Sequence, residues 1–150
     1  MGKKEKGSKF LLILTGLFAS TMSFACPSLQ EFYDALESEP AALIEALDEI
    51  LEQCYTDSEY FALAGAAHLR MGDLLRALEN LERALLLDPS NGSAAVDFAE
   101  VLFRQGQLIS AIEINAQLLT RTDLPEDLRE AISLRQNRWR GATNQKSFTL

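Results

Sequence analysis

A 34-residue stretch of this chain is followed by a second stretch that repeats its pattern. Residues 58–91 and 92–125 share six identities at an offset of 34, namely Arg70/Arg104, Gly72/Gly106, Leu74/Leu108, Ala77/Ala111, Glu79/Glu113 and Leu85/Leu119. Self-similarity at this period is typical of stacked helical hairpins, in which each unit buries its apolar face against the next. Such arrays present grooved surfaces, so the repeat favours binding over catalysis.

The spacing of apolar residues predicts seven helices and an all-α fold. Within the first repeat, Thr56-Asp57-Ser58 is expected to supply one N-cap and Asp73 the next, and Gly72 is expected to end a helix in the left-handed conformation. We expect antiparallel hairpins. The predicted segments are a leader (1–25), an N-terminal helical pair (26–57), two repeat units (58–125), a capping helix (126–140) and a flexible tail (141–150).

The order of large and small residues in the first unit resembles the tetratricopeptide repeat family. The matching positions are Phe61, Gly65, Ala77, Ala84 and Pro89, and the second unit matches more loosely at Phe98, Ala99, Leu102 and Ala111. Small residues are needed where the two helices of a unit cross closely. The resemblance implies a short right-handed solenoid that binds a protein or peptide segment, with no catalytic centre and no cofactor.

In that family, partner segments lie on the concave face formed by the first helix of each unit. Carried over by alignment, this face comprises Glu59, Ala62, Ala66, Leu69, Arg70, Ser93, Val96, Asp97, Glu100, Phe103 and Arg104. Arg70 and Arg104 would present two like charges to a partner; alternatively, they pair with nearby acids. Family members that hold a free C-terminal carboxylate use lysine and asparagine at the sites of Ala62 and Ala66, so that ligand is not expected here.

The N-terminus has the features of an export signal. Lysines at 3, 4, 6 and 9 precede a short apolar run at 10–19, and Ser23-Phe24-Ala25 fits a small-x-small cleavage site. We therefore expect cleavage after Ala25 and a periplasmic protein without a transmembrane span in the mature chain. Cleavage would leave Cys26 first, so a lipid anchor on Cys26 is an alternative.

The two cysteines predict a disulfide. Cys26 lies just before one expected helix and Cys54 ends the next, and an antiparallel helix pair brings those ends together. In an exported, oxidising compartment a Cys26–Cys54 bond is then expected.

Charge and motif content restrict the function classes. Residues 26–150 hold 10 basic and 21 acidic residues, and within them residues 129–150 hold five basic residues against one acid. Such an acidic body disfavours nucleic acid as a partner, whereas a basic protein would be attracted. The single histidine, His68, is expected to pack in the core. The sequence has no recognisable metal-binding or catalytic motif, so we predict a non-enzymatic protein without a metal.

The end of the chain suggests a narrower resemblance. The order of leader, short repeat array, basic helix and the alternating stretch 146–150 resembles the periplasmic front end of Gram-negative outer-membrane β-barrel proteins used in export or assembly. This implies an association with outer-membrane components, as a truncated relative or a partner. The Arg138-Trp139-Arg140 group allows two interpretations: packing of Trp139 with exposed arginines, or contact with a membrane interface or an anionic polymer.

Overall fold

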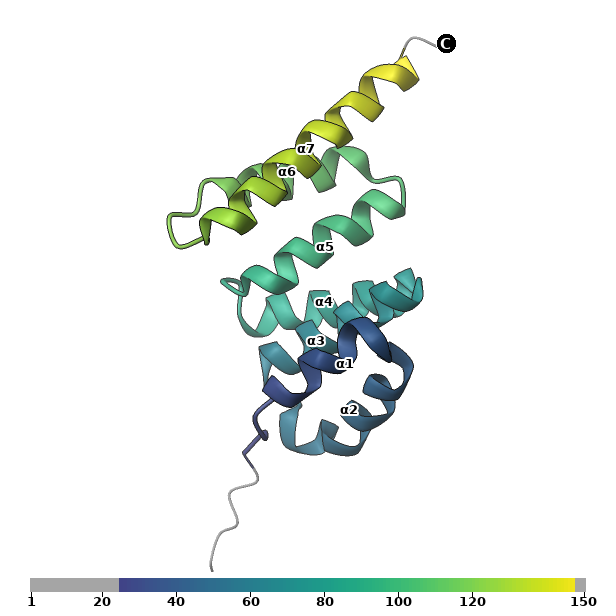
Figure 1. The fold of residues 1–150 in the computed structure, drawn as a ribbon, viewed down its shortest axis with the longest axis vertical. Coiled ribbons are helices and arrows are strands. Elements are labelled where there is room, and N and C mark those ends of the chain that lie inside the picture. Colours follow the sequence, from purple (N-terminus) through teal and green to yellow (C-terminus); the bar gives the residue numbers. More distant parts are fainter. Residues whose placement is uncertain (1–24, 148–150) are drawn as a thin grey trace, which may run out of the picture.

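The computed structural model describes residues 25–147, with side chains to residue 141. Within that range it has seven α-helices, one short 3-10 helix and no strand, which confirms the predicted all-α fold of stacked hairpins (Figure 1). The elements are η1 (Gln30–Phe32), α1 (Tyr33–Ser38), α2 (Pro40–Cys54), α3 (Ser58–Met71), α4 (Leu74–Leu87), α5 (Gly92–Arg104), α6 (Leu108–Leu119) and α7 (Glu126–Ser147). The predicted leader lies outside the described residues except for Ala25.

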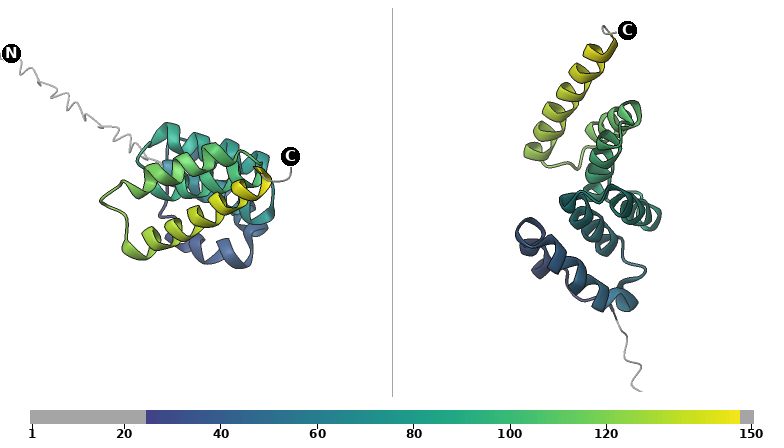
Figure 2. Two further views of the ribbon diagram at one scale, coloured as in Figure 1. Left: turned by 90° about the horizontal axis from the view of Figure 1, so that it is seen from above. Right: turned by 90° about the vertical axis from the view of Figure 1, so that its right-hand side faces the viewer.

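The helices keep the 34-residue period beyond the two units that share identical residues. The second helices of the hairpins, α2, α4 and α6, begin at residues 40, 74 and 108, and the first helices, α3, α5 and α7, begin at 58, 92 and 126. The hairpins stack along one axis, with α1 and α2 at one end and α7 at the other (Figure 2). Helix α2 is thus in register with α4 and α6, and α7 begins where a further first helix is due.

Local signals set the helix ends of the first unit as predicted. The Asp57 side chain accepts hydrogen bonds from the backbone N–H groups of Glu59 (2.8 Å) and Tyr60 (3.1 Å), and Asp73 accepts one from Arg76 N–H (3.2 Å). Gly72 ends α3 at φ 78°, a conformation that strains residues with a Cβ. These caps satisfy backbone donors that have no partner within the helix.

Close helix crossing explains the small residues of the first unit. A Cβ added to Gly65 would lie 2.6 Å from Leu81 Cγ and 3.3 Å from the carbonyl oxygen of Ala77. Leu81, Ala77 and Ala84 of α4 are fully buried, so α3 and α4 have no room to accept a larger side chain at this crossing. This confirms that Gly65, Ala77 and Ala84 are small because the two helices of the unit cross closely there.

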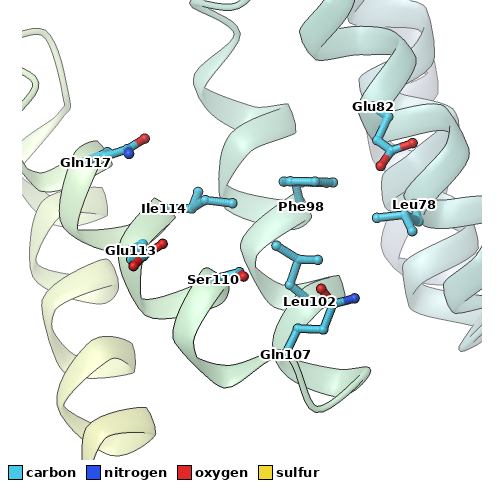
Figure 3. Close-up of a pocket in the computed structure, with 9 residues that line it drawn as sticks. All are labelled: Leu78, Glu82, Phe98, Leu102, Gln107, Ser110, Glu113, Ile114 and Gln117. Carbon is cyan, nitrogen blue, oxygen red and sulfur yellow. The ribbon is translucent and has the colours of Figure 1, made fainter.

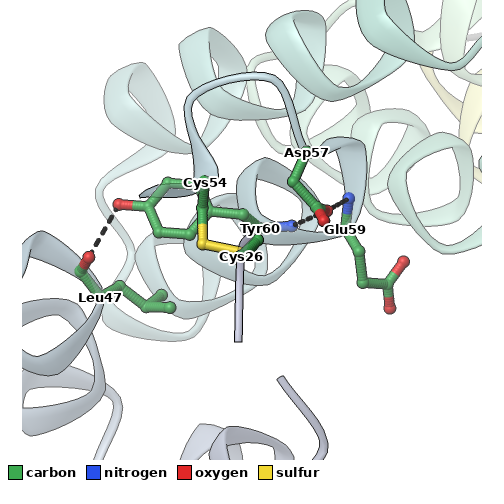
Figure 4. Close-up of a disulfide and its surroundings, with 6 residues drawn as sticks. All are labelled: Cys26, Leu47, Cys54, Asp57, Glu59 and Tyr60. Carbon is green, nitrogen blue, oxygen red and sulfur yellow. Dashed lines mark hydrogen bonds between the residues drawn. A yellow bond between two sulfur atoms is a disulfide. The ribbon is translucent and has the colours of Figure 1, made fainter. Parts of the chain in front are cut away.

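The N-terminal hairpin is closed by the predicted disulfide between Cys26 and Cys54 (Figure 4). Cys54 is fully buried and belongs to a core cluster with Leu47 and Tyr60. The Tyr60 hydroxyl donates to the Leu47 carbonyl oxygen at 3.1 Å, so α3 is also tied to α2 by a buried hydrogen bond. The disulfide thus joins the segment before α1 to the end of α2, next to α3.

Helix α7 is longer than predicted. We expected a helix to residue 140 and a flexible tail at 141–150, but α7 runs to Ser147, and residues 148–150 lie outside the described range. The stretch has no proline, and Gly141 does not take the positive φ that ends α3 at Gly72. Nothing in the backbone therefore stops the helix at residue 140, and the strand-like alternation at 146–147 does not form a strand.

Candidate partner-binding surface

The predicted concave-face residues lie on the first helices of two consecutive hairpins, five on α3 and six on α5. Their accessibility differs. Glu59, Arg70, Ser93 and Arg104 are exposed, and the other α5 residues of the set are half-buried. Leu69 is only 1% exposed and lies instead in the core between α3 and α4, so its side chain is not available to a partner.

A small pocket opens between α1, α3 and α5. It has a volume of about 110 Å³ and is lined by Tyr33, Leu36, Ala62, Leu63, Ala66, Ser93 and Asp97. Four of these residues belong to the predicted concave face. The small side chains of Ala62 and Ala66 leave the space open, whereas Tyr33 and Leu36 of α1 provide a wall that sequence alignment did not identify. The first helix of the N-terminal hairpin is therefore part of the site.

The two repeated arginines form ion pairs within the chain. The Arg70 guanidinium lies 2.8 Å from Glu37 of α1, and this contact lowers the pKa of the Glu37 carboxyl. Arg104 pairs with Glu100 at 2.8 Å and donates to the Leu69 carbonyl oxygen at 3.4 Å. Both arginines therefore pair with nearby acids, which was one of the two expected alternatives. A further contact of either arginine with a partner stays a prediction.

Asp97 is the unusual charged group of the pocket. Within the described part of the chain its carboxylate has no hydrogen bond and no ion pair, although Arg70 and Arg135 lie near enough to act on it electrostatically. Burial raises the pKa of Asp97, and the two arginines oppose that rise. A carboxylate that has lost water without gaining a direct partner is destabilised, and a cation placed in the pocket would relieve that cost.

Helix α7 covers the other end of the concave face through residues that we did not predict as part of the site. Arg135 donates to the Val96 carbonyl oxygen at 3.1 Å and to the Asn115 amide oxygen, and its guanidinium lies 4.7 Å from the Trp139 ring centroid. Trp139 is 4% exposed and stacks on Phe103 with ring centroids 4.5 Å apart. The packing interpretation of Trp139 is therefore confirmed, and Phe103 is covered by this helix.

Residues 68–135 match the family model of the tetratricopeptide repeat. That match supports the tetratricopeptide resemblance. Protein SGT1 homolog of Homo sapiens is 28% identical over 85 residues, which are 56% of this chain and 23% of that protein. The chain thus spans less than a quarter of the length of this curated relative. Tetratricopeptide repeats are generally non-catalytic modules that bind other proteins, so the match indicates an interaction scaffold.

The remaining titratable groups do not form a chemical site in the described part of the chain. His68 is 7% exposed in α3, as expected for a core residue, and burial lowers its pKa against the opposing effect of Asp73. Among the described residues, no cluster of three or more His, Cys, Asp or Glu side chains could hold a metal ion. Over the same range, no helix has the length and apolar content to span a membrane.

Proposed function

We propose that this protein is an exported tetratricopeptide scaffold of the bacterial cell envelope, and that its concave pocket binds a partner segment through a basic side chain. The observation that carries the proposal is the position of Asp97. Its carboxylate is half-buried in the pocket, and no described side chain bonds to it directly. A lysine or arginine of a partner would supply the missing charge, while Tyr33 and Leu36 would contact its aliphatic portion.

The charge of the face fits this class of partner. Three nearby arginines do not bond to Asp97 directly, since Arg70 is held by Glu37, Arg104 by Glu100 and Arg135 by the Val96 carbonyl of α5 and the Asn115 amide of α6. The absence of lysine and asparagine at the sites of Ala62 and Ala66 disfavours a partner held by its C-terminal carboxylate. A basic side chain in an extended segment therefore suits the pocket better than an anionic group.

Peptide selection followed by matched substitutions tests the proposal. Random peptides displayed against the full chain should be enriched in lysine or arginine beside an apolar residue. For a synthetic peptide selected in this way, Asp97→Asn should weaken binding about tenfold, because it removes the buried charge while keeping the shape. Glu45→Gln removes one exposed charge from α2 and is the control. Equal losses in the two variants, or enrichment of acidic peptides, would contradict the proposal.

Export into an oxidising compartment is supported by the leader-like N-terminus and by the Cys26–Cys54 bond. The alternative, a lipid anchor on Cys26, needs the same sulfur atom as the disulfide, so the two states exclude each other. Mass spectrometry of protein recovered from the periplasm of an expressing bacterium distinguishes them. We expect a chain beginning at Cys26 with the two cysteine thiol hydrogens missing; a mass increased by lipid would refute this expectation.

A role beside an outer-membrane export or assembly system rests on the order of segments in the sequence. Part of that order was the strand-like alternation at 146–150. Residues 146 and 147 are helical, so they do not support the role. Peripheral association with outer-membrane components is therefore the weaker part of the proposal. Co-fractionation of the tagged protein with outer membranes, lost after a salt wash, is the expected result if the association exists.

A further inference from the structure

A second hollow lies on the face opposite the concave pocket, between α4 and α6. This convex groove has a volume of about 390 Å³, and Figure 3 shows Leu78, Phe98, Leu102 and Ile114 bordering it from three helices. Glu82 of α4 and Glu113 of α6 flank it on opposite sides, and its lining contains no lysine or arginine. A partly buried apolar centre formed by α4, α5 and α6 therefore lies between two carboxylates.

Both carboxylates are free of partners in the chain's described part. Glu82 and Glu113 are exposed and form no hydrogen bond or ion pair there. Helix α6 has no cationic residue, and the two arginines of α4 are engaged elsewhere: Arg76 pairs with Asp73 at 3.5 Å, and Arg83 lies over the Phe61 ring. Neither arginine of α4 therefore neutralises Glu82 or Glu113, and the groove keeps a negative charge.

The apolar centre is a departure from the repeat. Ile114 stands at the position that Asn80 occupies one unit earlier, at the offset of 34. Asn80 bonds to its own helix, its amide donating to the Arg76 carbonyl oxygen at 2.9 Å, whereas Ile114 is half-buried at the edge of the groove. Ile114 thus adds an apolar side chain to those of Leu78, Phe98 and Leu102, where an asparagine would have made the groove more polar.

We propose that the convex groove binds an amphipathic helical segment of another protein, in which a large apolar residue is flanked by lysines or arginines. Helices commonly dock by placing an apolar face in a groove between two other helices. The flanking cations would meet Glu82 and Glu113, and the apolar residue would cover Phe98 and Ile114. The two hollows share no lining residue, so this site is distinct from the concave pocket.

The test uses a defined probe, a labelled synthetic helix of leucine, alanine and lysine with its leucines on one face and lysines beside them. We expect saturable one-to-one binding to the full chain by fluorescence anisotropy, weakened by salt. Glu82→Lys with Glu113→Lys should lower the affinity about tenfold or more, because two attractions become repulsions. Glu45→Lys with Glu130→Lys changes the net charge equally at exposed sites on α2 and α7, and should have a much smaller effect.

Ile114→Asn tests the apolar centre while restoring the residue type of the equivalent position. It should weaken the probe several-fold with unchanged helicity by circular dichroism. Equal losses in the two charge-reversed pairs would overturn the proposal, since binding would then follow net charge alone. Self-association abolished by the Glu82 and Glu113 reversals would also overturn it, by assigning the groove to a second copy. A loss with Asp97→Asn as large as that with the Glu82 and Glu113 reversals would also overturn it, by placing the probe in the concave pocket.

Discussion

Reduction of the Cys26–Cys54 disulfide should selectively loosen the N-terminal hairpin. The two cysteines are 28 residues apart in sequence, and one of them ends α2. For a loop of this length the chain-entropy model gives a stabilisation of about 3.5 kcal/mol, because the bond restricts the unfolded chain. Reduction is preferable to substitution as the perturbation, since Cys54 is fully buried and its replacement would also alter packing.

The repeat architecture predicts where this loss appears. Each hairpin packs mainly on its neighbours, so stability is approximately a sum of local terms. Helix α1 has six residues, too few to be stable in isolation, and it depends on α2 and α3 for its contacts. Helices α6 and α7 lie at the other end of the array (Figure 1). Opening of α1 and α2 should therefore become easier without a comparable change in α6 and α7.

Hydrogen exchange followed by mass spectrometry measures this difference in one experiment. For amides of α2 that exchange by opening of the hairpin, a loss of about 3.5 kcal/mol corresponds to exchange roughly 300-fold faster after reduction. The variant with Cys26→Ala and Cys54→Ala is the control and should not respond to the reductant. Unchanged exchange in α2, or equal acceleration in α2 and α6, would refute the reasoning.

Two further predictions concern the packing of α3. Gly65→Ala should destabilise the fold by about 1–2 kcal/mol in urea denaturation despite its better helix propensity, because the new methyl group meets Leu81; Gly141→Ala in α7, where a Cβ has no neighbour within 4 Å, should be neutral or stabilising. Burial lowers the pKa of His68, so the fold favours the neutral ring, and stability should fall as pH drops below about 6.5 toward the folded-state pKa. His68→Gln should reduce this dependence, and equal slopes between pH 7.5 and 5 in the two proteins would contradict it.

The features that could be predicted from sequence depend on short stretches of chain. The cap at Asp73 and the left-handed Gly72 each need only a few neighbouring residues, so residue type was sufficient, whereas residue type left the cap of α3 open among Thr56, Asp57 and Ser58. The disulfide was also predictable, because an antiparallel helix pair places the start of its first helix beside the end of its second, where the two cysteines lie. The start of α7 at residue 126 was predicted, and it agrees with a continuation of the 34-residue count.

The contacts that build the concave face depend on residues far apart in sequence. Glu37 meets Arg70 across 33 residues, and Arg135 reaches Val96 across 39. No periodicity identifies such partners, because each arginine had several acids or carbonyl groups within plausible reach. Asn115 offered one signal: it is fully buried on α6, and a buried amide requires a polar partner, which Arg135 provides.

The helices that flank the two recognisable units extend their core. Tetratricopeptide units bury their apolar faces against neighbours, and two units alone leave two open ends. Here α1 and α2 supply a further hairpin at one end; α1 has only six residues, and the Cys26–Cys54 bond joins the segment before it to the end of α2. At the other end α7 covers α5 and α6 through Trp139 and Arg135. The concave pocket therefore lies between α1, α3 and α5, and the convex groove between α4, α5 and α6, where flanking helices pack on both repeat units.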